Sequence, residues 1–251
     1  SYYVRAFAVN SAGVGYGPDG SSFKSCPSTF TAIHVAGFNG APVSKTVLYH
    51  SVSTKITGAL RCWLTQNLGS DTLAKTMTES AERSAGWYWQ FNRLQGYKHT
   101  GSVLTPSYSW SPWTSSISES SNWSASTDPC NKLLGLGWRL PTQTEWSAAA
   151  GAPQNWASAT DAWKSVLQLH NAGYLEYSAG GLTSRGSYSY YWTGTQYAST
   201  SYGYTLASGY SMTYLNKAYA LPVRCIRDTI ARGIPMISNV SLPDSSRTTT
   251  S

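Results

Sequence analysis

The feature that most constrains this chain is the tract from Gly186 to Val223, in which Lys217 is the only charged residue. Half of the chain's 18 tyrosines fall between Tyr188 and Tyr219, separated mainly by Ser, Thr and Gly. This composition is typical of a binding surface, in which tyrosine supplies stiff contact area and serine and glycine supply adaptable hydrogen bonding. It is equally typical of an ordinary antiparallel sheet rich in aromatic residues. Composition alone leaves both interpretations open.

The whole chain is low in charge but rich in tryptophan. Charged residues make up 12%, about half of the roughly 25% of an average globular protein, so solubility must rest on hydroxyl and amide groups. The 11 tryptophans exclude a disordered chain. A length of 251 residues favours one main domain with fragments at its ends.

The net charge of +7 does not predict nucleic-acid binding, because Lys and Arg are scattered singly along the chain. No run of about 18 apolar residues is present, so no membrane insertion is expected. The chain opens inside an expected strand without a signal peptide, which indicates an excerpt of a longer protein.

Four cysteines, Cys26, Cys62, Cys130 and Cys225, allow three disulfide pairings, and the sequence does not choose among them. Their wide separations and the scattered histidines show no metal-ligand spacing. Structural disulfides or buried thiols are expected, with no metal and no cofactor.

Both ends predict pieces of β-sandwich repeats. Residues 2–9, a glycine-containing turn and the start of a partner strand resemble the last hairpin of a fibronectin type III repeat, and residues 234–241 look like the first strand of a following Ig-like repeat. We therefore expect a terminal hairpin over 1–24, a main domain over 25–230, and a linker with a first strand over 231–251.

Several elements are predicted inside the main domain. Short strands are expected over residues 30–60, a turn of helix over 81–86, a buried aromatic run over 87–91 and long ordered loops over 100–128.

Two further helices are predicted. The capping box Thr142-Gln143-Thr144-Glu145 starts one that ends near Gly151. The second begins after Thr160 and runs to about Asn171, with His170 as a capping or packing residue.

Six motifs then occur in a fixed order along the chain. They are RCWLTQNL (61–68), GWYWQFN (86–92), DPC (128–130), GWRLPTQTEW (137–146), YWTGTQY (191–197) and LPVRCIRD (221–228). Together they resemble the Fibrobacter-type major paralogous domain, which is similar to the formylglycine-generating-enzyme branch of the C-type lectin fold. The resemblance implies an α+β, C-type-lectin-like fold with short antiparallel strands, two helices and long ordered loops.

Members of that branch include the variable proteins of diversity-generating retroelements, in which mutation at adenines rewrites a C-terminal stretch. An altered asparagine codon, AAC, can give Tyr, Ser, Thr, Ala, Gly or Leu, among others, but not Trp, Gln, Met or Lys. Residues 197–219 consist largely of the reachable set, with Gln196, Met212 and Lys217 as fixed points. The resemblance thus implies a variable region over about 190–228.

The implied function is a receptor-binding module of a phage tail fibre, located on the virion, or a bacterial cell-surface adhesin. Its partner is a host cell-surface receptor, protein or glycan, and a homotrimer is expected by analogy with tail fibres. The predicted ligand-binding residues are Tyr197, Ser199, Ser201, Tyr202, Tyr204, Tyr210, Ser211, Thr213, Tyr214, Asn216 and Tyr219. Because strands alternate faces, we expect about a third of these to be core residues instead.

Structural roles are expected for Cys62, Trp138, Arg139, Trp192, Arg224 and Cys225, with Trp146 and Leu206 also in the core. Arg139 and Arg224 are expected to hold buried loop carbonyls, and Cys62 and Cys225 to lie close together.

Two rival functions are weaker. The formylglycine-generating oxidase of the similar fold depends on reactive cysteine, but Cys225 has no second thiol near it in sequence, so no enzyme activity is expected. A calcium-dependent lectin needs clustered carboxylates, and no acidic residue lies between Glu176 and Asp228.

Overall fold

The computed structural model describes residues 7–10, 13–16, 26–107, 113–135, 137–208 and 210–228. The first two segments are an antiparallel hairpin of β1 (Phe7–Asn10) and β2 (Gly13–Tyr16), with Val9 opposite Val14. The hairpin predicted near the N-terminus is therefore present. The strand predicted over 234–241 lies outside the described residues.

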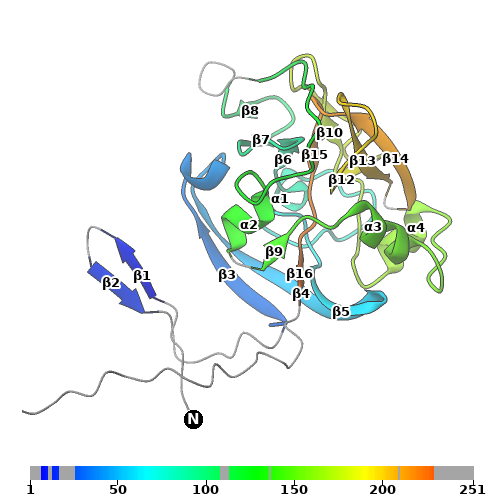
Figure 1. Cartoon of the computed structure of the whole chain (residues 1–251), viewed down its shortest axis with the longest axis horizontal. Helices are drawn as coiled ribbons and strands as arrows, with labels where there is room; N and C mark the ends of the chain where they lie inside the picture. Colours follow the sequence, from blue (N-terminus) through cyan, green and yellow to red (C-terminus); the bar gives the residue numbers. More distant parts are fainter. Residues whose placement is uncertain are drawn as a thin grey trace, which may run out of the picture. The chain divides into compact units, whose positions relative to one another are not determined.

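Residues 26–229 form a compact unit of the α+β class, built mostly from antiparallel strands (Figure 1). Its first sheet has the order β3-β4-β5-β16-β9. The strands are β3 (Thr29–His34), β4 (Lys45–Thr57), β5 (Ala59–Leu64), β9 (Trp138–Arg139) and β16 (Ile226–Asp228). Because β16 pairs with both β5 and β9, the end of the unit is built into the sheet that its beginning forms.

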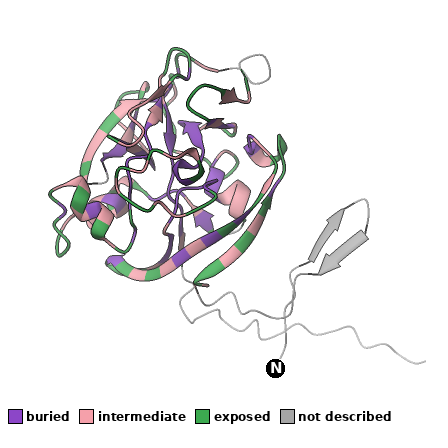
Figure 2. Ribbon diagram, turned by 180° about the vertical axis from the view of Figure 1, so that it is seen from behind, coloured by how far each residue is buried: buried purple, intermediate pink, exposed green. Residues whose placement is uncertain are grey.

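The expectation of only short strands over residues 30–60 is wrong for β4, which has 13 residues. No Gly or Pro interrupts this segment, and Val47, Tyr49 and Ser51 alternate as buried residues with more exposed neighbours. The alternation is visible along the long strands in Figure 2. The strand turns back only at Gly58, whose φ of +87° is in the region that favours glycine.

The second sheet has the order β11-β10-β15-β6-β7-β8. Its strands are β6 (Tyr88–Gln90), β7 (Gly96–His99), β8 (Leu104–Thr105), β10 (Tyr174–Leu175), β11 (Leu182–Thr183) and β15 (Ala220–Pro222). The aromatic run 87–91 is buried throughout, as predicted. In the described part of residues 100–128, β8 is the only strand, in agreement with the expected loops.

The third sheet joins β12 (Tyr190–Gln196), β13 (Tyr202–Ala207) and β14 (Ser211–Asn216), with β13 in the centre. Tyr204 lies opposite Tyr214, and Leu206 lies opposite Met212. Helix α3 (Gln143–Ala150) contacts all three strands, and it stands beside this yellow and orange sheet in Figure 1.

The helices are short. They are α1 (Glu82–Ala85), α2 (Pro129–Leu134), α3 and α4 (Ala159–Lys164), with a 3-10 turn over Phe38–Gly40. The predicted capping box of α3 is confirmed, since Thr142 accepts from the Glu145 amide and the Glu145 carboxylate accepts from the Thr142 amide. The short helix over 81–86 is also confirmed as α1.

The second predicted helix is wrong beyond Lys164. α4 begins at the N-cap Ser158 and ends at Ser165, whose hydroxyl donates to the Ala162 carbonyl and accepts from the Leu167 amide. Gln168 then takes a positive φ of 49°, which no helix accommodates. His170 is buried but lies outside any helix.

Two disulfides, Cys26–Cys62 and Cys130–Cys225, use all four cysteines. Cys62 and Cys225 belong to the same core cluster, which also holds Trp138 and Trp192. A second cluster contains Trp146, Tyr191 and Leu206. The four core residues expected from sequence, Trp138, Trp146, Trp192 and Leu206, are all buried.

Candidate ligand-binding face

The sheet β12-β13-β14 has a back that faces the core and a front that carries tyrosines. On the back, Gly203 lies against Phe91 and Trp192, because a Cβ there would come within 2.5 Å of the Phe91 ring. On the front, Leu206 and Met212 pack into the second core cluster at the α3 end. The front of the sheet is therefore covered by the second core cluster at the α3 end and uncovered at the other end.

The uncovered end carries four tyrosines that touch one another, Tyr197, Tyr202, Tyr204 and Tyr214, which we name the front tyrosine cluster. The Tyr197 and Tyr214 rings are stacked with centroids 4.1 Å apart. Tyr204 meets Tyr197 at 5.1 Å, and Tyr202 meets Tyr214 at 5.5 Å, both edge to face. Tyr202 and Tyr214 are exposed.

None of the eleven predicted ligand-binding residues is buried. Exposed are Ser199, Tyr202, Ser211 and Tyr214, and half-buried are Tyr197, Ser201, Tyr204, Tyr210, Thr213, Asn216 and Tyr219. The alternate residues Gly203 and Thr205 are buried. The backbone is thus held from behind while the tyrosines contact solvent.

The eleven residues do not form one patch. Ser211 and Thr213 lie opposite Ala207 and Thr205, which places their side chains on the back of the sheet. Tyr210 packs against the second core cluster, and Tyr219 belongs to a different group of rings. The front tyrosine cluster is the part that the structure brings together.

The turn between β12 and β13 is held by the loop over residues 113–124. Asn122 accepts a hydrogen bond from the Gln196 amide at 2.9 Å, and the Ser118 hydroxyl donates to the Thr200 hydroxyl at 3.0 Å. The Glu119 amide donates to the Thr200 carbonyl at 3.1 Å. These contacts fix the turn beside the front tyrosine cluster.

Lys217, the one charge of the tract, is fully buried. Its ammonium lies 4.9 Å from the centroid of the Phe91 ring and donates to the Glu119 carbonyl at 2.6 Å. Burial lowers the pKa of Lys217 below its ordinary value. This residue ties the end of β14 to the 113–124 loop.

The two arginines expected to hold carbonyls behave differently. Arg224 is fully buried and donates to the carbonyls of Leu64 and Leu167 at 3.2 and 2.7 Å. Arg139 donates to the carbonyl of its neighbour Leu140 at 3.2 Å, but its main partners are carboxylates. Both of its terminal nitrogens bind Glu145 at 2.7 Å, and Asp228 lies at 3.0 Å.

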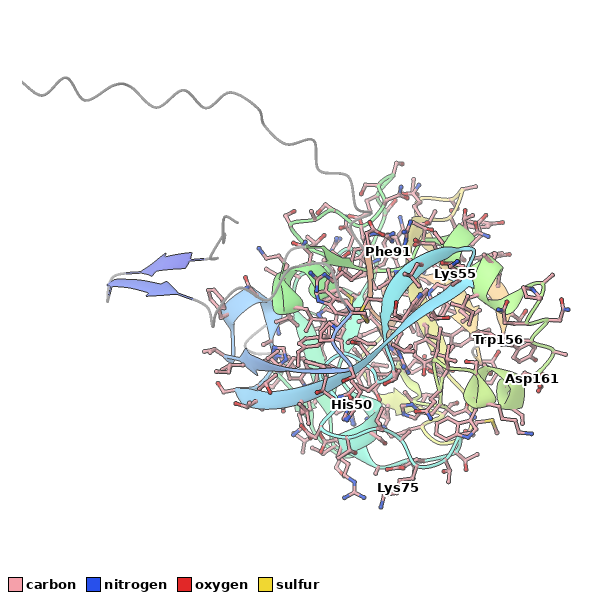
Figure 3. The ribbon with its side chains drawn as sticks, turned by 90° about the horizontal axis from the view of Figure 1, so that it is seen from below. His50, Lys55, Lys75, Phe91, Trp156 and Asp161 are labelled. Carbon is pink, nitrogen blue, oxygen red and sulfur yellow. A yellow bond between two sulfur atoms is a disulfide. The ribbon has the colours of Figure 1, made fainter. Side chains whose placement is uncertain are left out.

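Two features of the surface did not emerge from the sequence. One is a second group of rings around Tyr219, whose other members come from β10, the turn after β10, the residues just before β12, and β12 itself. The other is a pocket of about 400 Å³ lined by Thr54, Ile56, Gln154, Trp156, Asp161, Lys164, Ser165 and Val166. Figure 3 labels Trp156 and Asp161 of this pocket. Both features join residues that are far apart in sequence, so no local sequence pattern predicts them.

Within the described ranges, no three His, Cys, Asp or Glu side chains come together as a metal site, and no helix is long and apolar enough to cross a membrane. Cys225 is buried in its disulfide with Cys130. No family model matches the sequence, and neither the curated proteins nor the solved structures give a match.

Proposed function

We propose that this chain is a ligand-binding module that uses the front tyrosine cluster to bind a protein or glycan on the surface of a host cell. The observation that carries the proposal is the alternation of exposure along β13: Tyr202 and Tyr204 reach solvent, whereas Gly203 and Thr205 are buried. Such a strand keeps its backbone when its outer side chains change.

The chemistry of the cluster suits this role. Each tyrosine offers a broad apolar ring with one hydroxyl, so it can pack on an apolar surface and also make a directed hydrogen bond. Only two side-chain torsions per tyrosine are lost on binding, which keeps the entropy cost low. Rings that already contact one another, such as Tyr197 and Tyr214 at 4.1 Å, are partly ordered before any ligand arrives.

Our proposal includes a C-type-lectin-like fold of the formylglycine-generating-enzyme type and a variable region of the retroelement kind. Support comes from three residues between Gln196 and Tyr219 that adenine mutation of AAC cannot produce. The buried Lys217 ammonium donates to the side-chain oxygen of the half-buried Gln196, and Met212 packs against the second core cluster. In this interpretation the fixed residues hold the sheet and the variable ones meet the ligand.

The carrier is proposed to be a phage tail fibre, with a bacterial surface adhesin as the alternative. Sequencing of the neighbouring DNA tests the class. We expect a near-copy of the codons for residues 190–228, differing where that copy has adenine, beside a reverse transcriptase gene. A neighbourhood without such a copy would contradict the retroelement assignment.

Binding is tested with the fluorescently labelled chain on a panel of bacterial cells. We expect saturable binding to a subset of strains and loss of that binding in the double variant Tyr202→Ser/Tyr214→Ser. The matched control is Leu48→Ser, which removes an exposed apolar side chain from β4. Equal binding by the double variant and the wild type would overturn the role of the cluster.

A further inference from the structure

We propose that a second surface, formed by Tyr174, Tyr177, Tyr188, Tyr190 and Tyr219 around Glu176, binds an arginine side chain of a basic partner protein. We name these five tyrosines the second tyrosine cluster. The inference does not rest on the function proposed for the front tyrosine cluster, because the two clusters share no residue.

The five rings form a continuous chain. Tyr188 meets Tyr190 at 5.1 Å, and Tyr190 meets Tyr174 at 5.3 Å. Tyr219 then lies 5.8 Å from Tyr174 and 5.2 Å from Tyr177. Tyr177 and Tyr188, at the two ends, are 44% and 37% exposed, so a partner can reach both.

The backbone beneath this surface is fixed by the second sheet. Tyr174 lies in β10, which pairs with β11 on one side and β15 on the other, and Tyr219 comes immediately before β15. Tyr174, Tyr190 and Tyr219 also pack against the first core cluster. Tyr174 and Tyr190 are therefore held by strands, while Tyr177 and Tyr188 extend the surface from the adjoining turns.

This surface carries one negative charge, that of Glu176. Among the residues that the structure describes, Glu176 takes part in no ion pair, whereas Asp71, Glu82 and Glu119 pair with Lys45, Lys98 and Arg93.

Glu176 is close to two of the rings. Burial, and after it the charge of Glu176, raises the pKa values of Tyr174 and Tyr219. An ionised carboxylate accepts hydrogen bonds at both of its oxygens, so Glu176 can accept from the N–H donors of a ligand.

A guanidinium group fits this combination best. Ring faces attract cations, and the planar guanidinium stacks on an aromatic face while its fork of N–H donors matches a carboxylate. An ammonium is more strongly hydrated and gains less from the rings. The whole chain carries a net charge of +7, which disfavours a basic peptide on average, so affinity for such a peptide must come from a local site.

Tyr190 of the second tyrosine cluster and the front tyrosine cluster lie on opposite faces of the third sheet. Tyr190 pairs with Ala207, and the side chains of this pair point to the back of the sheet. The side chains of Tyr204 and Tyr214 point to the front, as that of Leu206 does. A ligand of the front tyrosine cluster therefore leaves the second tyrosine cluster free.

The test is a titration of the full chain with the peptide Ac-Gly-Arg-Gly-Arg-Gly-amide, followed by NMR of the tyrosine ring signals at low ionic strength. We expect saturable shifts at Tyr177, Tyr188 and Tyr219. The peptide with citrulline, a neutral analogue of arginine, should bind at least tenfold more weakly, and the lysine peptide about threefold more weakly. Equal affinity for the arginine and citrulline peptides would overturn the proposal without any variant being made.

Variants locate the site. Glu176→Gln should weaken the arginine peptide about tenfold and Tyr177→Leu several-fold, with melting temperatures near that of the wild type. Tyr214→Ser, in the front tyrosine cluster, is the matched control and should leave the affinity unchanged. If Tyr214→Ser weakens the peptide and Glu176→Gln does not, the peptide does not bind at the second tyrosine cluster. If the peptide does not bind at all, this inference fails, but the cell-binding experiment on the front tyrosine cluster is not affected.

Discussion

The ammonium of Lys217 donates a hydrogen bond to the side-chain oxygen of Gln196 at 3.2 Å. Both residues lie in the tyrosine-rich tract, one after β14 and one at the end of β12. The same ammonium reaches the Glu119 carbonyl, so one buried charge joins two strands and a loop. The lone cation of an uncharged tract is thus a structural residue.

The first prediction concerns this lysine. Lys217→Met keeps an unbranched side chain but removes the donor, leaving the Glu119 carbonyl and the Gln196 amide oxygen without it. A charged hydrogen bond of this kind contributes about 1.5–3 kcal/mol, so urea unfolding should show a loss in that range. The control is Lys55→Met, an exposed lysine labelled in Figure 3, which should change stability by less than about 0.5 kcal/mol. Equal effects would mean that the buried contacts contribute nothing.

The second prediction concerns the back of the sheet. Gly203→Ala puts a methyl group 2.5 Å from the Phe91 ring and 3.0 Å from Trp192, so the core must shift. Overpacking of this kind costs about 1–3 kcal/mol. Gly181→Ala meets nothing within 4 Å and should change the free energy of unfolding little. A neutral Gly203→Ala variant would show that β13 is not pressed against the core.

Sequence reasoning succeeded where the determining signal is local. The capping box of α3 is complete within Thr142 to Glu145, and the aromatic run over residues 87–91 is buried as predicted. It failed where the signal competes with tertiary contacts. α4 stops at Ser165 although apolar residues continue at helical spacing, because the Ser165 hydroxyl bonds its own backbone neighbours.

The long-range features could not be predicted at all. The pairing Cys130–Cys225 spans 95 residues, and nothing near either cysteine encodes it. The second tyrosine cluster joins Tyr174 and Tyr177 to Tyr219 through the pairing of β10 with β15. Such sites depend on strand order, which composition and periodicity do not specify.

The third prediction is an acid-induced loss of stability from two buried histidines. Burial lowers the pKa of His170 to about 3 and that of His34 to about 4, against 6.5 in the unfolded chain. Below pH 6.5 the unfolded chain binds protons that the folded chain does not, so the free energy of unfolding falls as pH drops, by up to about 1.4 kcal/mol per pH unit for each histidine.

Urea unfolding between pH 5 and 8 measures this slope. His170→Leu should reduce it by about one proton below pH 6.5 and leave it unchanged between pH 7 and 8, where both histidines are neutral in either state. An unaltered slope in the variant would assign the acid sensitivity to other groups.

The fourth prediction separates two roles of Glu145. Glu145→Gln retains a side chain that can cap α3 but loses the charged pair with Arg139, whose nitrogens bind it at 2.7 Å. Because the pair is partly exposed, we expect a loss of only about 1 kcal/mol. Glu145→Ala should lose about 1 kcal/mol more, because the Thr142 amide then loses its side-chain acceptor as well. Thermal unfolding of the two variants measures the difference, and identical losses would exclude a separate capping contribution.

The fifth prediction compares two tyrosines of one sheet that face different surroundings. Tyr214 is 47% exposed in the front tyrosine cluster, while Tyr191 is fully buried and its hydroxyl donates to the His170 carbonyl at 2.6 Å. Tyr214→Ala should lose only the ring contacts with its neighbours, about 0.5–1.5 kcal/mol. Tyr191→Ala leaves a cavity and an unpaired carbonyl, which costs about 3–5 kcal/mol.

For a domain of this size, 1 kcal/mol corresponds to a shift of about 2–4 °C in melting temperature. Differential scanning calorimetry should therefore place Tyr214→Ala within about 6 °C of the wild type and Tyr191→Ala about 6–20 °C below it. If Tyr214→Ala unfolds as early as Tyr191→Ala, the front rings are part of the core. A surface that must keep its side chains in order to fold cannot vary them for recognition, and the proposed function would then lose its physical basis.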